Sequence, residues 1–472
     1  MTRNDCLRAA AAYFDGGGFF TDLQRRIAFR TEGDTGTVPP SLDAYLRSEI
    51  TPTLEQIGFV CELIANPAPN GGPFLIARRI EDADLPTVLT YGHGDVVSGQ
   101  DAQWREGLQP WALTIEGERW YGRGTADNKG QHTINLGALA QVLHARGGQL
   151  GYNLTLLLEM GEEAASPGLH EVCRQEADRL RADLLIACDG PRVSAQRPTL
   201  FLGSRGAVNF SLRLRARQRA HHSGNWGGVL ANPATQLSHA VATLADANGR
   251  ILVDALRPRD IPASVREALA TIEIGGGPDD PAIDDDWGEP GLSPAERLMA
   301  WNTIEVLALG AGSPQRPVNA IPAEAVAHCQ LRFVVGTPWQ DLASIVRAHL
   351  DARGFGQVEV QVTLEGAATR LDVDNPWVVW AQRSIEESTG QRPDVLPNLA
   401  GSLPNDVFAD LLGLPTLWVP HSYPACAQHA PNEHLLAPLA REGLQIMAGL
   451  YWDLGDAASN APWHAGAPRP TS

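Results

Sequence analysis

The chain has 472 residues, 43% of them hydrophobic, with 37 basic and 55 acidic side chains and a formal net charge of −18. At about 100–200 residues per domain, this length predicts two or three domains, each with a sizeable core. The excess of acidic side chains disfavours binding to nucleic-acid phosphates and to anionic lipid surfaces. We therefore expect no nucleic-acid partner and no membrane partner.

The sequence shows neither a targeting segment, nor a membrane span, nor a cysteine motif. No segment approaches the roughly 18 apolar residues that cross a bilayer, and the N-terminal residues lack the apolar core of a signal peptide. The six cysteines are far apart and none forms a C-x-x-C pair, so zinc fingers and thioredoxin-type redox pairs have no support. We read Cys188 and Cys426 as packing residues, because free cysteines are usually buried and inert. These observations predict a cytoplasmic protein.

The predicted elements alternate in the first third of the chain. Helical patterns occur at 5–14, 41–57, 133–145 and, much later, 376–389. Continuous apolar runs, typical of strands buried on both faces, occur at 87–91, 154–158, 184–188 and 415–419. This alternation predicts the α/β class, with a mixed, mostly parallel sheet and flanking helices.

The pattern changes near Gly203. Residues 209–217 alternate between apolar and polar side chains, as a half-exposed strand does. The elements predicted after it are a helix, two strands, a helix and a strand, at 233–246, 303–309, 323–335, 339–352 and 358–364. This is the β-α-β-β-α-β order of a ferredoxin-like α+β unit.

The simplest domain arrangement is an α/β domain interrupted by a smaller one. We predict that residues 1–203 and 367–455 form the α/β domain and that 204–366 form the inserted ferredoxin-like domain. Residues 261–294 are read as a loop-rich insertion, and 456–472 as a flexible tail.

Histidine and acidic residues follow the predicted buried strands or precede a predicted helix. They are His93, Asp95, Asp127, Glu162, Glu163, Asp189 and His429. Each alone would be read as an ordinary loop or turn residue. Because the carboxyl ends of parallel strands meet at one edge of a sheet, we expect these side chains to converge. So many carboxylates together are costly unless a cation neutralises them, and the nitrogen and oxygen ligands suit zinc, manganese or cobalt.

Six segments make the pattern specific: Tyr91–Val97, Gly122–Gly130, Glu159–Leu169, Cys188–Gly190, His221–Gly228 and Gln428–His434. In these segments and in their order, the chain resembles the co-catalytic dizinc metallopeptidase superfamily of clan MH. That superfamily includes carnosine dipeptidases, aminoacylases, glutamate carboxypeptidases and acetylornithine or succinyl-diaminopimelate deacylases. The resemblance implies that the inserted domain is a lid and dimerisation domain.

The resemblance also implies a ligand set for two divalent metal ions, with zinc expected first and manganese or cobalt as alternatives. His93 and Asp189 would bind one ion, Glu163 and His429 the other, and Asp127 would bridge them. The family often has a cis peptide bond after the bridging aspartate, which here joins Asp127 to Asn128.

Further roles follow from the same resemblance. Glu162 would be the general base, and Asp95 would fix the tautomer of the His93 imidazole. His222 would reach the active site of a partner subunit and stabilise the oxyanion, which requires a homodimer formed through the lid. Arg332 and Asn319 would hold the substrate's carboxylate, and Gly401 and Ser402 would form a substrate loop whose backbone can approach the ligand. For Arg332, a structural ion pair is the competing interpretation.

These features predict a metal-dependent hydrolase that cleaves the amide bond of a small carboxylate-bearing substrate, such as a dipeptide or N-acyl amino acid. The alternatives are a specialised amidase for a non-peptide amide and a non-catalytic binding protein on the same fold. A dinuclear phosphoesterase is disfavoured because no cluster of basic residues that could bind a phosphate is evident near the predicted ligands. Because of the insertion at 261–294, the sequence does not predict which substrate side chains are preferred.

Overall fold

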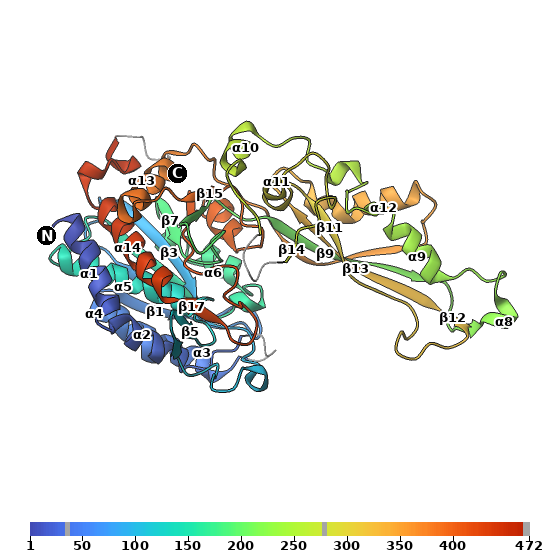
Figure 1. Cartoon of the computed structure of the whole chain (residues 1–472), viewed down its shortest axis with the longest axis horizontal. Coiled ribbons are helices and arrows are strands. Elements are labelled where there is room, and N and C mark those ends of the chain that lie inside the picture. The colour runs from blue at the N-terminus through green and yellow to red at the C-terminus, as the bar shows by residue number, and fades with distance from the viewer. Residues whose placement is uncertain (34–37, 276–280, 466–472) are drawn as a thin grey trace.

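A computed structural model describes residues 1–33, 38–275 and 281–465. Figure 1 shows a large body that contains the N-terminal helices and the C-terminal helix, and a smaller, elongated part that extends from it. We call the smaller part, built on strands β9, β11, β13 and β14, the lid. None of the helices in the described ranges is long and apolar enough to cross a membrane.

The large body is organised by an eight-stranded sheet in the order β1-β2-β6-β3-β7-β16-β8-β15. Its four central strands are the four apolar runs of the sequence, and they lie parallel to one another: β6 (Asn153–Glu159), β3 (Thr87–His93), β7 (Leu184–Ala187) and β16 (Thr416–Trp418). The outer strands, some of them antiparallel, are β1 (Val60–Ile64), β2 (Phe74–Arg79), β8 (Thr199–Phe201) and β15 (Asp394–Leu396). The prediction of a mixed, mostly parallel sheet is confirmed.

Both faces of this sheet are buried, which explains the continuous apolar runs. Along β7, Leu184 and Ile186 belong to one core, while Leu185 and Ala187 belong to the core on the opposite face. The first core is covered by α1 (Arg3–Asp15), α2 (Gly18–Ile27), α5 (Lys129–Ala145), α13 (Pro376–Thr389) and α14 (Ala437–Leu454). Residues 40–56 form one nearly continuous helical stretch, α3 (Pro40–Tyr45), a π-helical turn (Leu46–Ile50) and α4 (Thr51–Gln56), which ends before Gly58 at φ +85°.

The lid contains a four-stranded antiparallel sheet in the order β11-β13-β9-β14. The strands are β9 (Gly206–Arg215), β11 (Thr303–Gly310), β13 (Glu324–Phe333) and β14 (Glu359–Gly366), and helices α9 (Pro233–Val241) and α12 (Leu342–Asp351) complete its core. The chain order and the strand order are those of the expected ferredoxin-like unit. At the outer end of the lid lie β10 (His221–His222), α8 (Ser223–Trp226) and β12 (Ala320–Ile321).

The segment read as a loop-rich insertion contains helical structure. Helices α10 (Ala263–Leu269) and α11 (Pro294–Met299) bury Val265, Leu269 and Met299 in the second core of the large body. Helices α10 and α11 lie within the range expected for the lid but pack on the large body. Residues 276–280 of this segment lie outside the described residues.

The remaining α-helices and β-strands in the described ranges are smaller. They are α6 (Leu169–Gln175), α7 (Ala177–Leu180), and a three-stranded sheet of β4 (Thr114–Glu116), β5 (Arg119–Tyr121) and β17 (His434–Leu436). The expected flexible tail is packed at its start, because the Trp463 ring lies 4.9 Å from that of Trp377 and Ala461 is fully buried. Residues 466–472 of that tail lie outside the described residues.

Candidate active site

The sheet delivers the predicted site residues to one edge. His93 is the last residue of β3 and pairs in register with Glu159, the last residue of β6. Glu162 and Glu163 lie in the turn that follows β6, and Asp189 lies two residues beyond β7. All of these positions are at the carboxyl ends of parallel strands, where α/β sheets bind ligands.

Asp127 lies between two imidazoles. Its Oδ1 is 3.0 Å from Nε2 of His93, and its Oδ2 is 3.0 Å from Nε2 of His429. Nε2 of His429 is also 3.0 Å from Oε2 of Glu163, and Nε2 of His93 is 3.7 Å from Oδ2 of Asp189. The five predicted metal ligands therefore form two groups that share Asp127.

The donor set fits divalent cations. Ligand atoms of His93, Asp127 and Glu163 all lie within 4.8 Å of one another. Oε1 of Glu163 is buried and has no hydrogen-bond partner among the described residues. Buried carboxylates without such partners are costly, and a cation held by carboxylate oxygens and imidazole nitrogens removes that cost.

Burial and mutual repulsion perturb these groups. Burial raises the pKa of Glu163 and of Asp189, and the nearby Asp127 charge raises both further. For His93, burial opposes protonation, but hydrogen bonds to Asp127 and Asp95 outweigh it and raise its pKa. Hydrogen bonds to Asp127 and Glu163 raise the pKa of His429. Without a cation, this site therefore holds protons that a metal ion would displace.

Asp95 organises both sides of the site. Its carboxylate accepts hydrogen bonds from the backbone N–H groups of Glu162 at 3.2 Å and Glu163 at 3.1 Å. Nδ1 of His93 is 3.1 Å from the Asp95 backbone carbonyl and 3.4 Å from its Oδ1. Asp95 thus contacts the imidazole mainly through its backbone and holds the turn that carries the two glutamates. The expected cis peptide bond joins Asp127 to Asn128.

Glu433 is a buried residue to which the sequence analysis assigned no role. Its carboxylate accepts hydrogen bonds from the backbone N–H groups of Gly124, Ala126 and Asp127 at 2.8–3.0 Å. It also forms a fully buried ion pair with Arg123 at 2.8 Å. Glu433 therefore fixes the loop that presents Asp127. The sequence feature that could have identified Glu433 is its position in the Gln428–His434 segment, four residues after His429.

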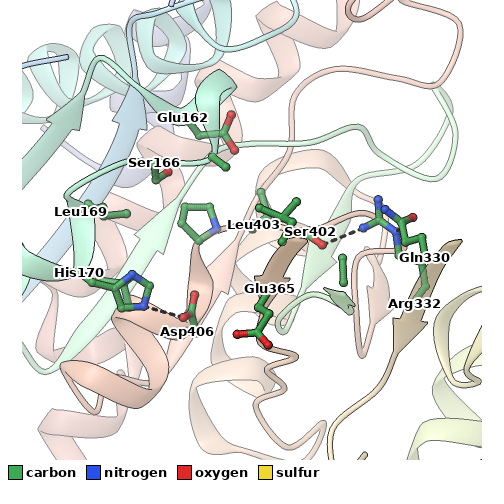
Figure 2. A pocket seen from close by; sticks show the side chains of 16 residues that line it. Glu162, Ser166, Leu169, His170, Gln330, Arg332, Glu365, Ser402, Leu403 and Asp406 are labelled. Carbon is green, nitrogen blue, oxygen red and sulfur yellow. Dashed lines mark hydrogen bonds and ion pairs between the residues drawn. The ribbon is translucent and has the colours of Figure 1, made fainter. Parts of the chain in front are cut away.

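A cavity of about 320 Å³ opens beside Glu162 and is lined also by Arg332 and Ser402. In Figure 2, Nη1 of Arg332 donates to Oγ of Ser402 at 2.8 Å. Nε of Arg332 donates to Oε1 of Gln330 at 2.7 Å, so these two hydrogen-bond partners of the guanidinium, Ser402 and Gln330, are uncharged. No ion pair among the described residues supports the competing interpretation, a structural ion pair for Arg332. Gly401 precedes Ser402 in this loop but does not line the cavity.

Two predicted residues lie far from this site within one chain. His222 is exposed on β10 at the outer end of the lid, where β10 pairs with β12 (Figure 1). Asn319 lies beside it, because its carbonyl accepts the N–H of Ser223 at 2.8 Å. The fold of a single chain thus brings Arg332 and Ser402 to Glu162 but leaves His222 and Asn319 at the lid's far end.

Known proteins are similar to this chain in sequence and fold. The chain is 25% identical over 418 residues to Beta-Ala-His dipeptidase of Rattus norvegicus, covering 84% of this chain and 82% of that protein. It is 27% identical over 413 residues to Cys-Gly metallodipeptidase DUG1 of Saccharomyces cerevisiae, covering 82% of each. The crystal structure of an M20 family metallo-carboxypeptidase, Sso-CP2 from Sulfolobus solfataricus, superposes with a TM-score of 0.78 at 24% identity, covering 93% of this chain and 99% of that one. A model of "Peptidase family M20/M25/M40" matches residues 89–453, so the expected resemblance is confirmed and the chain belongs to this family.

Proposed function

We propose that this protein is a metal-dependent hydrolase that cleaves the amide bond of a dipeptide or N-acyl amino acid. The observation that carries the proposal is the position of Asp127, whose two carboxylate oxygens each lie 3.0 Å from a different imidazole, with Glu162 beside them. The names of the two related dipeptidases support the same substrate class.

The metal ligands in this proposal are His93 and Asp189 for one ion, Glu163 and His429 for the other, and Asp127 for both. Imidazole and carboxylate ligands suit zinc first, with manganese or cobalt as alternatives. When bound, two such ions supply Lewis acidity, which polarises an amide carbonyl and makes a water molecule more acidic.

Glu162 serves as the general base. Its carboxylate lies 3.9 Å from Nε2 of His93, is one-fifth exposed, and faces the cavity that holds Arg332. Burial raises its pKa, which suits a group that takes a proton from the attacking water and then gives it to the leaving amine. Asp95 positions this residue by binding its backbone N–H.

Arg332 and Ser402 bind the substrate's carboxylate. Among the described residues, the guanidinium donates to the uncharged side chains of Gln330 and Ser402, so its charge is available to a ligand. A planar guanidinium can donate two parallel hydrogen bonds to a carboxylate, and the Ser402 hydroxyl lies next to it. Gly401 does not line this cavity itself, but without a side chain it leaves the backbone beside Ser402 open to the substrate.

A homodimer formed through the lid completes the site. Strand β11 is an edge strand that exposes Val306, Leu307 and Leu309, and such an apolar edge favours pairing with a second chain. Exposed His222 and neighbouring Asn319 then serve the partner's active site, with His222 donating to the oxyanion. Mixing His222→Ala chains with Glu162→Ala chains should restore activity in mixed dimers, and inactive mixed dimers would refute this sharing.

We also propose a reducing, cytoplasmic location. All six cysteines lie in the described ranges, none forms a disulfide there, and five are buried. Structural disulfides are rare in reducing compartments, so free cysteines agree with that location.

Replacing Glu162 by Gln tests the proposed chemistry. Zinc, manganese or cobalt should still bind, while the hydrolysis rate of dipeptides and N-acyl amino acids falls by at least about 10²-fold. Glu324→Gln, which alters an exposed ion pair on the lid sheet, is the matched control and should leave the rate unchanged. If the parent protein loaded with each metal hydrolyses none of these substrates but cleaves aryl amides, the substrate class is wrong.

A further inference from the structure

The cavity beside Glu162 extends beyond the groups that the proposed chemistry uses. Figure 2 shows the Arg332–Ser402 pair at one side and a second pair, His170 and Asp406, at the other, with Glu365 between them. The three additional polar residues come from α6, from the loop after Ser402, and from the lid strand β14. Neither the metal site nor the carboxylate-binding pair requires them.

Apolar residues also line the cavity, with Leu403 between the two pairs and Leu169 on the His170 side. Leu169 and Val407 are fully buried and Leu403 is 8% exposed, while Leu364 contributes a half-exposed side chain from the lid. Methylene groups pack favourably against such walls. The cavity of about 320 Å³ therefore has an apolar middle section that accepts the stem of a side chain.

The far end of the cavity is anionic. Asp406 is 20% exposed and its Oδ2 lies 2.8 Å from Nε2 of His170. Glu365 has no ion-pair partner within 4.0 Å among the described residues. With His170 protonated the three groups carry a net charge of −1, and with His170 neutral the charge is −2. Either state favours a positively charged ligand.

We propose that this end of the cavity selects a substrate whose carboxylate-bearing residue has a long basic side chain, such as lysine or arginine. The inference rests on the proposed function, in which Arg332 and Ser402 bind the substrate's carboxylate and Glu162 faces the scissile amide. From that anchor the side chain extends past Leu403 toward Val407 and Leu169. Its cationic head then lies between Glu365 and Asp406.

The size of the preference follows from partly exposed ion pairs. Each is worth roughly a two- to fivefold change in kcat/KM, so two carboxylates give about a tenfold preference for lysine over an uncharged side chain of equal length. Norleucine is that comparison, because it has the same number of side-chain carbons and lacks the amine.

The test compares kcat/KM for Ala-Lys, Ala-norleucine and Ala-Glu. The parent should favour Ala-Lys over Ala-norleucine about tenfold, with Ala-Glu poorest, and the ratio should fall toward one in the Glu365→Gln/Asp406→Asn double variant. Glu359→Gln, on the same strand but outside the cavity wall, is the matched control and should keep the parental ratio. An equal or lower rate for Ala-Lys in the parent, or an unchanged ratio in the double variant, would overturn the proposal.

A binding measurement separates this proposal from the proposed function. Calorimetry with the metal-loaded Glu162→Gln variant should show tighter binding of Ala-Lys than of Ala-norleucine, whether or not the parent hydrolyses either. If the parent hydrolyses neither dipeptide, the proposed function fails, while a lysine preference in binding still supports the anionic end of the cavity. Equal binding of the two dipeptides would refute the lysine preference itself.

Discussion

The role assigned to Glu433 can be tested by replacing it with Gln. In the parent, Oε1 accepts the N–H groups of Ala126 and Asp127, and Oε2 accepts those of Gly124 and Arg123. Glutamine keeps one acceptor oxygen, but its amide nitrogen then faces two donors. The variant thus loses two hydrogen bonds and leaves the 1%-exposed Arg123 without its ion-pair partner.

Breaking a buried ion pair in this way costs about 3–5 kcal/mol. At about 2 °C for each kcal/mol in a large domain, Tm should fall by roughly 6–10 °C. Because the same carboxylate fixes the Asp127 N–H, metal affinity should also fall by about 10- to 100-fold, as it does when residues that support metal ligands are replaced.

The assay is thermal unfolding followed by calorimetric titration of the metal-free protein with zinc. Glu324→Gln removes a carboxylate that is 44% exposed and is the matched control, with an expected change in stability within about 0.5 kcal/mol. A Glu433→Gln protein that melts within about 2 °C of the parent and binds zinc equally well would refute this account of the loop.

Two further outcomes are expected. The raised pKa values of His93, Glu163, Asp189 and His429 mean that the metal-free site holds protons near neutral pH, so zinc binding should release protons and tighten as pH rises from about 5 to 8. Calorimetry in two buffers of different ionisation enthalpy measures this release, and pH-independent binding without proton release would contradict it. Replacing Arg332 by Gln should raise KM for dipeptides by about 10- to 100-fold with a smaller change in kcat, because it removes a charge-assisted hydrogen bond to the substrate. Steady-state kinetics provide the check, and an unchanged KM would remove Arg332 from carboxylate binding.

The sequence predicts the centre of the fold better than its periphery. The central strands are continuous apolar runs because helices cover both sheet faces, so local composition identifies β3, β6, β7 and β16. Strands β8 and β15 are three residues long and β1 is partly exposed, so none gives a comparable pattern. Helix α14 is not among the predicted helices, although most of its residues are buried.

Contacts between distant segments account for the remaining differences. Whether helix α10 packs on the lid or on the large body depends on tertiary contacts with strands such as β15, which local patterns do not encode. The metal-site residues were identified because each lies in a recognisable short segment. Glu433 and Arg123 are 310 residues apart, and His170 and Asp406 are 236 apart, so their pairing is visible only in the folded chain.

Anomalous diffraction from crystals grown with zinc tests the central claim most directly. The account predicts two strong peaks per chain, about 3.5–4 Å apart, on either side of the Asp127 carboxylate. One should be bound by His93 and Asp189, and the other by Glu163 and His429. A single peak, no peak, or peaks bound by other side chains would contradict the account.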